Sequence, residues 1–398
     1  MFYAGIDIAK SKHEASVIDS DGKALLDSIS FANSKEGCEK LLVLFERLGI
    51  DKDDVLIGME ATGHYWLSVH AFFLELGYDI KVINPIQSEA FRKMYIRQTK
   101  NDSKDSFIIA QIMRFGQFSA TTLSEENIVA LRQLSRYRLA LVDACGDCKR
   151  RVIALLDQVF PEYDSFFSDT FGVTSKEILL KYPTPEDMLN VSTRKLTTLL
   201  NKASRGRFGE EKAEQLKALA AGSFGIAFAK DAFAFQIRQL MEQLVFLEKQ
   251  ISELEQQISD LLKQMGSFIT TIPGIGDTLG AIILSEIGDI HRFDAPGKLV
   301  AFAGLDVKVN QSGEFTGTKS KISKRGSPYL RRAIWLAAQR AAFCDPILSE
   351  YYQSLRARGK HHLTAVGAVS RKLCNIIFVI LRENRPYESS PPVRKNLS

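Results

Sequence analysis

Four acidic residues in the first 105 positions have the types and spacing for divalent-metal chemistry. Asp7 interrupts an apolar stretch, Glu60 closes another, and Asp102 and Asp105 lie three residues apart at the start of an expected helix. Carboxylates that converge repel one another unless divalent cations neutralise them. Mg²⁺ favours a few carboxylates together with water and substrate phosphate, and two such ions can clamp the attacking and leaving oxygens of phosphoryl transfer. The four acids therefore predict a Mg²⁺ site for phosphoryl transfer.

Each acid also has a plainer interpretation when it is taken singly. Asp102 fits a helix N-cap, Glu60 a charge at a strand end, and Asp7 a hydrogen-bonded buried group. Asp7 is the hardest to explain without a ligand, because a carboxylate inside an apolar strand costs several kcal/mol unless it is paired or bound to metal.

A serine in the C-terminal third offers a second reactive group. Ser312 precedes Gly313 in a stretch, residues 304–332, whose glycines keep the chain open and which is dense in Lys and Arg. The cations that we expect to bind nucleic acid are Lys308, Lys319, Lys321, Lys324, Arg325, Arg331 and Arg332. A hydroxyl among cations suits phosphate chemistry. The alternative is a solvated basic loop with a turn at Ser312, since Ser-Gly pairs are common in turns.

The charge of the chain is divided unevenly. Its 398 residues carry a net charge of +5, but residues 291–398 hold 19 Lys and Arg against 7 Asp and Glu, a net of +12 that leaves −7 for the first 290. A positive C-terminal part predicts a polyanionic partner such as nucleic acid. We see no signal peptide, the longest apolar run, 373–381, is too short to span a bilayer, and five scattered cysteines suit reduced thiols. We therefore expect a cytoplasmic protein without a membrane partner.

The elements that must position the acids follow from alternation and turn signals. Strands are expected over 3–8, 13–18, 24–31, 54–60 and 78–84, and helices over 35–48, 65–76 and from Asp102 to about Phe115. This order is typical of the ribonuclease H-type fold, which the sugar-kinase superfamily shares. We therefore expect an α/β domain over residues 1–120, with Asp7 and Glu60 at one sheet edge and with Asp102 and Asp105 on one helix face.

Two long helices with heptad periodicity are expected in a coiled-coil domain over residues 121–265. The first seam runs Leu131, Leu134, Arg138, Leu141, Cys145, Cys148, Val152, Leu155 and Val159, and the second runs Ile237, Leu240, Leu244, Leu247, Ile251, Leu254, Ile258, Leu261 and Met265. Cys145 and Cys148 fit this seam better than a zinc site, which needs a second ligand pair. A helical insertion at about 161–225 separates the two helices, which pair either within the chain or with another subunit.

The third predicted domain, residues 266–384, is mostly helical. A Pro-Gly-Ile-Gly turn containing Gly274 and Gly276 fits a helix-hairpin-helix, whose backbone N–H groups bind a DNA phosphate without reading bases. The alternative is a tight turn between two helices. Further helices are expected over 328–343, 346–358 and 363–383, followed by a disordered tail over 385–398.

Seven short motifs fall in the order of a known family. They are GIDIAK (5–10), MEATG (59–63), KNDSKD (100–105), IPGIG (272–276), AGL (303–305), QSG (311–313) and SKRG (323–326). In this order the chain resembles the DEDD transposases of the IS-one-ten family, relatives of the Piv DNA invertase that are described as bridge-RNA-guided recombinases. The resemblance extends to about Glu383. Asp306 and Val307 depart from it, since a Pro-containing stretch is expected there, and so does the insertion.

The resemblance implies a RuvC-like N-terminal domain, a coiled coil and a C-terminal transposase domain. It implies that Asp7, Glu60, Asp102 and Asp105 hold Mg²⁺ and that Ser312 is the nucleophile, forming a phosphoserine link with DNA. Donor and target DNA, a guide noncoding RNA and further copies of the chain, as a dimer or tetramer, are the implied partners. Because Ser312 and the acids lie in different predicted domains, such a site is composite.

Three other functions compete with this one. A RuvC-like Mg²⁺-dependent nuclease would use water, with Ser312 only binding phosphate. A sugar-kinase-like enzyme is disfavoured by the missing second phosphate-binding half and by the positive C-terminal part. A pure nucleic-acid-binding scaffold would tolerate neutralisation of all four acids.

Overall fold

The computed structural model divides the chain into two compact units, Met1–Leu123 and Ser124–Ser398. It describes residues 1–60, 64–83, 88–89, 91, 102–116, 120–121, 126–307, 311–312, 315–316 and 322–389. The finer division predicted within the second unit, at residue 265, stays a prediction.

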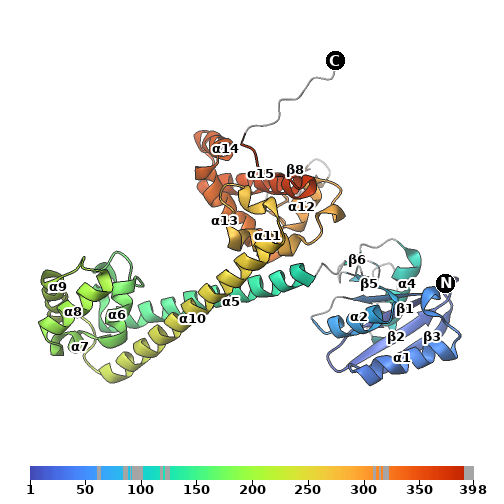
Figure 1. The fold of residues 1–398 in the computed structure, drawn as a ribbon, viewed down its shortest axis with the longest axis horizontal. Coiled ribbons are helices and arrows are strands. Elements are labelled where there is room, and N and C mark those ends of the chain that lie inside the picture. Colours follow the sequence, from blue (N-terminus) through green and yellow to red (C-terminus); the bar gives the residue numbers. More distant parts are fainter. Residues whose placement is uncertain are drawn as a thin grey trace, which may run out of the picture. The chain divides into compact units, whose positions relative to one another are not determined.

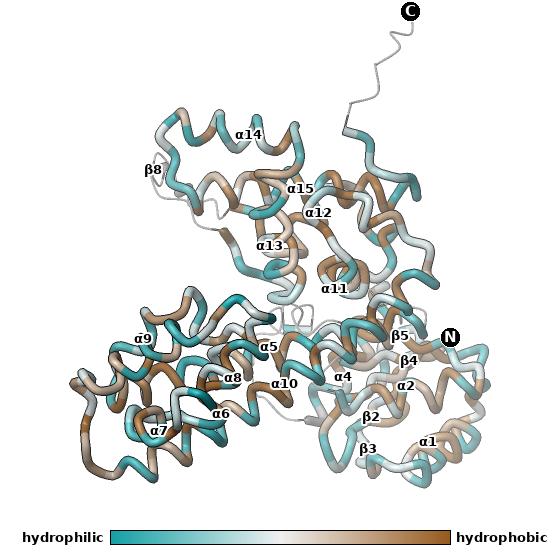
Figure 2. The backbone as a smooth tube through the Cα atoms, turned by 60° about the vertical axis from the view of Figure 1, so that its left-hand side comes forward, coloured by the Kyte–Doolittle hydropathy of each residue, from teal (hydrophilic) through white to brown (hydrophobic). Residues whose placement is uncertain are grey.

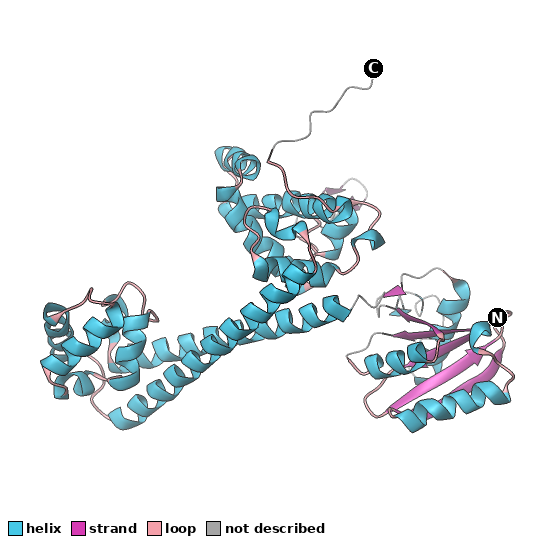
Figure 3. Ribbon diagram, in the orientation of Figure 1, coloured by secondary structure: helices cyan, strands magenta, loops and turns pink. Residues whose placement is uncertain are grey.

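The first unit is built on a mixed sheet with the strand order β3-β2-β1-β4-β5-β6 (Figures 1 and 3). The strands are β1 (Phe2–Asp7), β2 (Lys12–Ile18), β3 (Ala24–Ala32), β4 (Val55–Glu60), β5 (Asp79–Ile83) and the two-residue β6 (Ala120–Thr121). β1 runs parallel to β4 and β4 to β5, whereas the pairs β1–β2, β2–β3 and β5–β6 are antiparallel. The predicted ribonuclease H-type fold is confirmed.

Helices cover both faces of this sheet. Helices α1 (Lys35–Arg47) and α2 (Trp66–Glu75) pack on the face that carries Ala4 and Ile6, and a short turn, η1 (Lys52–Asp54), leads into β4. On the opposite face, α4 (Asp102–Phe115) contributes a cluster of isoleucines that packs against Tyr3 and Leu56. Side chains alternate between the faces of a strand, so β1 and β4 are buried on both sides.

The second unit contains an antiparallel hairpin of α5 (Glu126–Val159) and α10 (Lys230–Gln264) (Figure 1). Apolar residues recur along both helices (Figure 2). Arg138, the polar member of the first seam, donates from Nε to Glu255 on α10 at 2.9 Å. Cys145 and Cys148 are buried in the same core, as predicted, and burial raises the pKa of the Cys145 thiol. The seams therefore meet within one chain.

The insertion forms a helical cap at one end of the hairpin (Figure 1). Its elements are η2 (Pro161–Ser165), α6 (Val173–Lys181), α7 (Pro185–Asn190), α8 (Thr193–Ser204) and α9 (Glu210–Ala221). Their apolar residues share one core with the adjoining half of the hairpin. Tyr163 lies fully inside it and hydrogen-bonds Ser175 at 2.9 Å.

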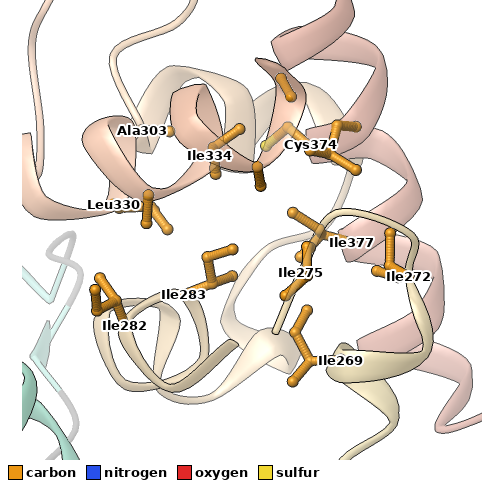
Figure 4. Close-up of a cluster of buried hydrophobic side chains, with 14 of the residues drawn as sticks. Ile269, Ile272, Ile275, Ile282, Ile283, Ala303, Leu330, Ile334, Cys374 and Ile377 are labelled. Carbon is orange, nitrogen blue, oxygen red and sulfur yellow. The ribbon is translucent and has the colours of Figure 1, made fainter. Parts of the chain in front are cut away.

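A helical bundle lies at the other end of the hairpin (Figure 1). It comprises η3 (Phe268–Thr271), α11 (Asp277–Ile287), η4 (Ile290–Arg292), α12 (Pro296–Phe302), β7 (Gln311–Ser312), β8 (Phe315–Thr316), α13 (Pro328–Cys344), α14 (Pro346–Ala357) and α15 (His362–Glu383). Figure 4 shows Ile283, Ile334 and Ile377 from three of these helices facing one another. The bundle is the mostly helical C-terminal part that the sequence predicts.

Helix α15 is long and apolar enough to cross a membrane by length and composition, although its longest apolar run, 373–381, is too short. In the structure 61% of its most apolar window is buried. Val366, Leu373 and Ile377 belong to the core of the bundle. Packing against the neighbouring helices thus accounts for its apolar character.

Candidate active site and nucleic-acid interface

Asp7 and Glu60 end two adjacent parallel strands. The register pairs Gly5 with Gly58 and Ile6 with Met59, and its next step places Asp7 beside Glu60. In a parallel pair both strand ends lie at the same edge, so the fold brings the first two predicted acids together. Glu60 also accepts a hydrogen bond from Ser88 Oγ at 2.6 Å.

Two glycines show on which face of the sheet these acids lie. A Cβ at Gly5 would overlap the backbone of α4 at Ser106 and Ala110, and a Cβ at Gly58 would overlap the Met113 side chain. Both glycines therefore face α4, and their lack of a side chain lets the helix lie directly on the sheet. Asp7 and Glu60 are two residues further along their strands, so they project toward the same side as α4.

Helix α4 carries the other two predicted acids. Its Ser106 shares a hydrogen bond of 2.7 Å with Ser16 on β2, and Ser16 in turn donates to the carbonyl of Asp27 at 2.6 Å. Ser16 pairs with Gly5 in the sheet, so this buried contact fixes the beginning of α4 over β1. Asp105 adjoins Ser106 and is buried, 8% exposed. Asp102 begins α4, but its side chain lies outside the described part of the structure.

The acids supply oxygen donors only. The side chains of Asp7 on β1 and Glu60 on β4 project to the side of the sheet that α4 covers, and α4 carries Asp105. No group of three or more His, Cys, Asp or Glu side chains lies at metal-binding distance among the described residues, a set that leaves out the side chain of Asp102. A set made of carboxylates suits hard cations such as Mg²⁺ and not zinc, which prefers nitrogen and sulfur ligands. The donor chemistry thus fits the predicted ion.

Ser312 lies in a short β-hairpin and not in an open loop. β7 and β8 pair Gln311 with Thr316 and Ser312 with Phe315. The side chain of Ser312 lies outside the described residues, as do the whole of Lys308, Lys319 and Lys321. The predicted surroundings of the Ser312 hydroxyl therefore stay a prediction.

The base of the segment that holds Ser312 is clamped. Val307 bridges to Ile322, and the amide of Ser323 donates to the Asp306 carbonyl at 2.8 Å. The Ser323 hydroxyl also donates to the Asp306 carboxylate, and the Lys324 amide donates to the Gly304 carbonyl at 3.1 Å. Asp306 and Val307, the residues that depart from the expected family pattern, thus close this base, which we call the Ser312 stem (residues 304–307 and 322–327).

Glu286 anchors the Ser312 stem to two helices, and sequence analysis missed it. It lies in the apolar helix α11, and its side chain is 4% exposed. Arg136 on α5 donates to both carboxylate oxygens, at 2.6 and 3.0 Å, and this hydrogen bonding raises the pKa of the Arg136 guanidinium. Ser327 Oγ donates to Glu286 at 2.7 Å and accepts from the Leu330 amide, which caps α13. A single charge inside the apolar run 279–287 was the available signal.

The cations in the Ser312 stem and directly after it divide into two kinds. Arg332 forms a two-pronged ion pair with Asp143 on α5, at 2.8 and 2.9 Å, which raises the pKa of its guanidinium. Arg331 donates to the carbonyl of Ala303 at 3.4 Å. Lys324 and Arg325 are exposed. Two of the cations predicted to bind nucleic acid therefore have intramolecular partners as well.

The predicted helix-hairpin-helix turn packs tightly against α13. Gly274 has a φ of +90°, and a Cβ there would lie 2.8 Å from the Ala341 nitrogen and 2.9 Å from the Ala337 carbonyl oxygen. Packing alone thus requires glycine at 274. Gly276 is different, because it precedes the first turn of α11 without a side-chain cap and its Cβ position is open. The backbone N–H groups at the start of α11 can donate hydrogen bonds to an anion there.

Comparison with known proteins agrees with this arrangement. A DEDD transposase family model of the IS110 type matches residues 4–161, and a model described as "Transposase IS116/IS110/IS902 family" matches residues 266–353. The 44.8 kDa protein of insertion element IS116 from Streptomyces clavuligerus is 24% identical over 98% of this chain and 97% of its own.

Two further relatives carry functional names. The pilin gene-inverting protein of Moraxella bovis is 24% identical over 97% of both chains, and the mini-circle putative transposase for IS117 of Streptomyces coelicolor is 26% identical over 91% of this chain and 89% of its own. The first family model covers the acid-bearing unit and continues through α5, and the second covers the part of the bundle that contains the Ser312 stem. The chain belongs to the IS110/IS116 family of DEDD transposases, which are DNA strand-transfer enzymes.

Proposed function

We propose that this transposase cuts and rejoins DNA through a phosphoserine intermediate, with Ser312 as the nucleophile and a Mg²⁺ site on Asp7, Glu60, Asp102 and Asp105. The observation that carries the proposal is the convergence of Asp7 and Glu60 at one sheet edge under α4. The family's divalent-metal chemistry fits these oxygen donors.

In the proposed step, Ser312 Oγ attacks the phosphorus of a DNA phosphodiester. The Oγ–P bond forms, the bond between phosphorus and one sugar oxygen breaks, and the serine proton ends on that leaving oxygen. The number of phosphate ester bonds is unchanged, so a second sugar hydroxyl can reverse the step and join a new strand without an external energy source. This conservation separates recombination from hydrolysis.

Charge stabilisation is the main demand of this step. When bound, Mg²⁺ polarises the phosphate and offsets the charge that develops on its oxygens. Lys324 and Arg325, which are exposed in the Ser312 stem, would hold the DNA backbone near the serine. The acids and Ser312 belong to different compact units, so the proposal requires both to reach the same phosphodiester in the assembled complex.

The partners follow from the same proposal. Donor and target DNA are the substrates, and the positive C-terminal part supplies the attraction to them. By the family resemblance, we further propose that a noncoding RNA guides the choice of DNA and that the enzyme works as a homo-oligomer.

The test is trapping of the covalent intermediate. Labelled DNA that contains the element ends is incubated with the enzyme and Mg²⁺ and resolved on denaturing gels. We expect a protein–DNA adduct that Ser312→Ala abolishes without weakening DNA binding, and that Asp7→Asn reduces to background. An adduct that survives Ser312→Ala refutes the nucleophile. Cleavage by Ser312→Ala without any adduct would instead identify a nuclease that uses water, which the acid set within one unit also allows.

A further inference from the structure

The helical insertion carries a concentrated positive segment that the strand-transfer site does not use. Between Val191 and Phe208 there are five Lys and Arg and no Asp or Glu. The rest of the insertion, over residues 161–225, carries four Lys and Arg against nine Asp and Glu. This segment, which comprises α8 and the turn after it, is therefore positively charged, whereas the rest of the insertion carries a net negative charge.

The cations of this segment are turned to solvent. Arg194, Lys195, Lys202, Arg205 and Arg207 are all exposed, whereas Leu196 and Leu200 bury the opposite side of α8 in the insertion core. Among the residues that the structure describes, none of the five forms an ion pair with a carboxylate. Other lysines of the insertion are engaged, such as Lys176 with Glu248 and Lys212 over the ring of Phe166. The charge of α8 is thus available to an outside partner.

A groove of about 560 Å³ runs along the exposed side of α8. Lys195 and Lys202 line it seven residues apart, which is about 10 Å along a helix. Arg194 from the first turn of α8 and Lys181 from the end of α6 add two more cations. Lys181 has one weak partner, Glu177, at 3.9 Å. Four cations around one groove fit a chain of phosphates better than a single anion.

The lining of the groove also contains uncharged side chains. Tyr182, half-buried at the end of α6, and Leu199 on α8 also line the groove and add an aromatic ring and an apolar side chain to the cations. Ser192 and Thr198 add hydroxyls that can bind phosphate or sugar oxygens. An aromatic ring flanked by cations is the arrangement that binds single strands, because unpaired bases stack on the ring while the backbone follows the charges. Duplex DNA, whose bases are already stacked, leaves such a ring unused.

We infer that the groove between α6 and α8 is a binding site for a single-stranded nucleic acid segment, with Lys195 and Lys202 on its phosphates and Tyr182 stacked on an unpaired base. The site lies in the second compact unit and needs neither Ser312 nor the acids. It gives the insertion a role in holding a strand away from the reacting phosphodiester. A test of this binding site can therefore fail or succeed independently of a test of the proposed strand-transfer function.

The first test measures binding of the full chain to fluorescent single-stranded DNA, single-stranded RNA and duplex DNA by anisotropy across a salt series. Removing two phosphate contacts should lower the slope of log affinity against log salt by about 1.4. If the affinities of wild type and variant become equal near 1 M salt, this slope difference corresponds to an affinity about 25-fold lower at 0.1 M salt. We expect this loss of affinity and of salt slope for the variant Lys195→Glu/Lys202→Glu with single-stranded DNA or RNA. The control Lys249→Glu/Lys263→Glu on α10 changes the net charge equally at exposed sites outside the groove and should have a much smaller effect.

The second test locates the strand. A single strand carrying 5-iodouracil is photocrosslinked to the full chain, and the modified peptide is sequenced. We expect the crosslink at Tyr182, and Tyr182→Phe should retain binding while Tyr182→Leu weakens it about tenfold or more. The inference would be overturned by equal loss of affinity in the two double variants or by unchanged single-strand binding in Lys195→Glu/Lys202→Glu. It would also be overturned by a loss of affinity confined to duplex DNA, or by crosslinks found only outside residues 181–202. A preference between DNA and RNA in the affected binding would identify which strand the groove takes.

Discussion

The substitution Gly5→Ala tests whether contact between α4 and β1 aligns the acids. A methyl group at Gly5 would overlap the backbone of Ser106 and Ala110, and these backbone atoms cannot move without the helix. The helix must retreat by about 1.4 Å for the nearest atom to reach the 3.4 Å of ordinary contact. Such overpacking costs about 1–3 kcal/mol of stability. A misplacement of about 1 Å in a catalytic group costs on the order of 100-fold in rate, so adduct formation should fall by about that factor.

Gly58→Ala is the matched control, because it adds the same methyl group on the next strand, against the same helix. There the methyl would meet the side chain of Met113, which can change rotamer without moving α4. We expect a loss of less than about tenfold in rate. Adduct yield over a Mg²⁺ titration is the assay, with circular dichroism to show that both variants fold. Equal rates for wild type and Gly5→Ala, or equal losses in the two variants, would refute the proposed alignment.

Three further predictions concern the buried charges, the histidines and the exposed cations. Glu286→Ala should destabilise the second unit by about 2–3 kcal/mol in urea unfolding, because the Glu286 side chain is only 4% exposed and is bound by Arg136 and Ser327. The control Glu255→Ala removes a carboxylate that is 41% exposed and should cost under about 1 kcal/mol. Equal costs would contradict an anchoring role for Glu286. Burial lowers the folded pKa of His13 and His70 below the ordinary 6.5, so the unfolded chain binds protons first and stability should fall as pH drops below about 6.5. His70→Phe should flatten that fall in thermal melts from about pH 7.5 to 5.5, and an unchanged slope would exclude His70 as a cause. Arg325→Ala should lower the salt slope of duplex DNA binding by about 0.9 while Arg332→Ala, already paired with Asp143, lowers it less; the reverse order would show that Arg332 leaves Asp143 for the DNA.

Much of the first unit was predictable because its signals are local. Strands β1 to β5 and helices α1, α2 and α4 fall within one or two residues of the expected bounds, since alternation and caps such as Ser34 specify them. The close approach at Gly5 and Gly58 was not predictable. It depends on which residues of α4 lie over which strand, and that requires the three-dimensional packing.

Contacts between distant segments account for the rest. Arg136 and Glu286 are 150 residues apart, and nothing in either neighbourhood specifies the other. Heptads specify a seam but not its partner, so the sequence left open whether α5 pairs with α10 or with another chain. The hairpin of Ser312 was missed because strands of two residues are too short to show alternation. The charge of Arg332 indicated an anionic partner, and the partner in the structure is Asp143.

The length of the hairpin sets a scale for the second unit. Helix α5 has 34 residues, which corresponds to about 51 Å. The insertion caps one end of the hairpin and the bundle with the Ser312 stem packs at the other (Figure 1). A nucleic acid bound at both ends must bridge several tens of ångströms, on the order of 15 nucleotides at the 3.4 Å rise of a stacked strand. If the proposed sites at both ends hold nucleic acid, the hairpin sets the distance between them, and removing one heptad from each of its helices should shorten a nuclease footprint by about three nucleotides.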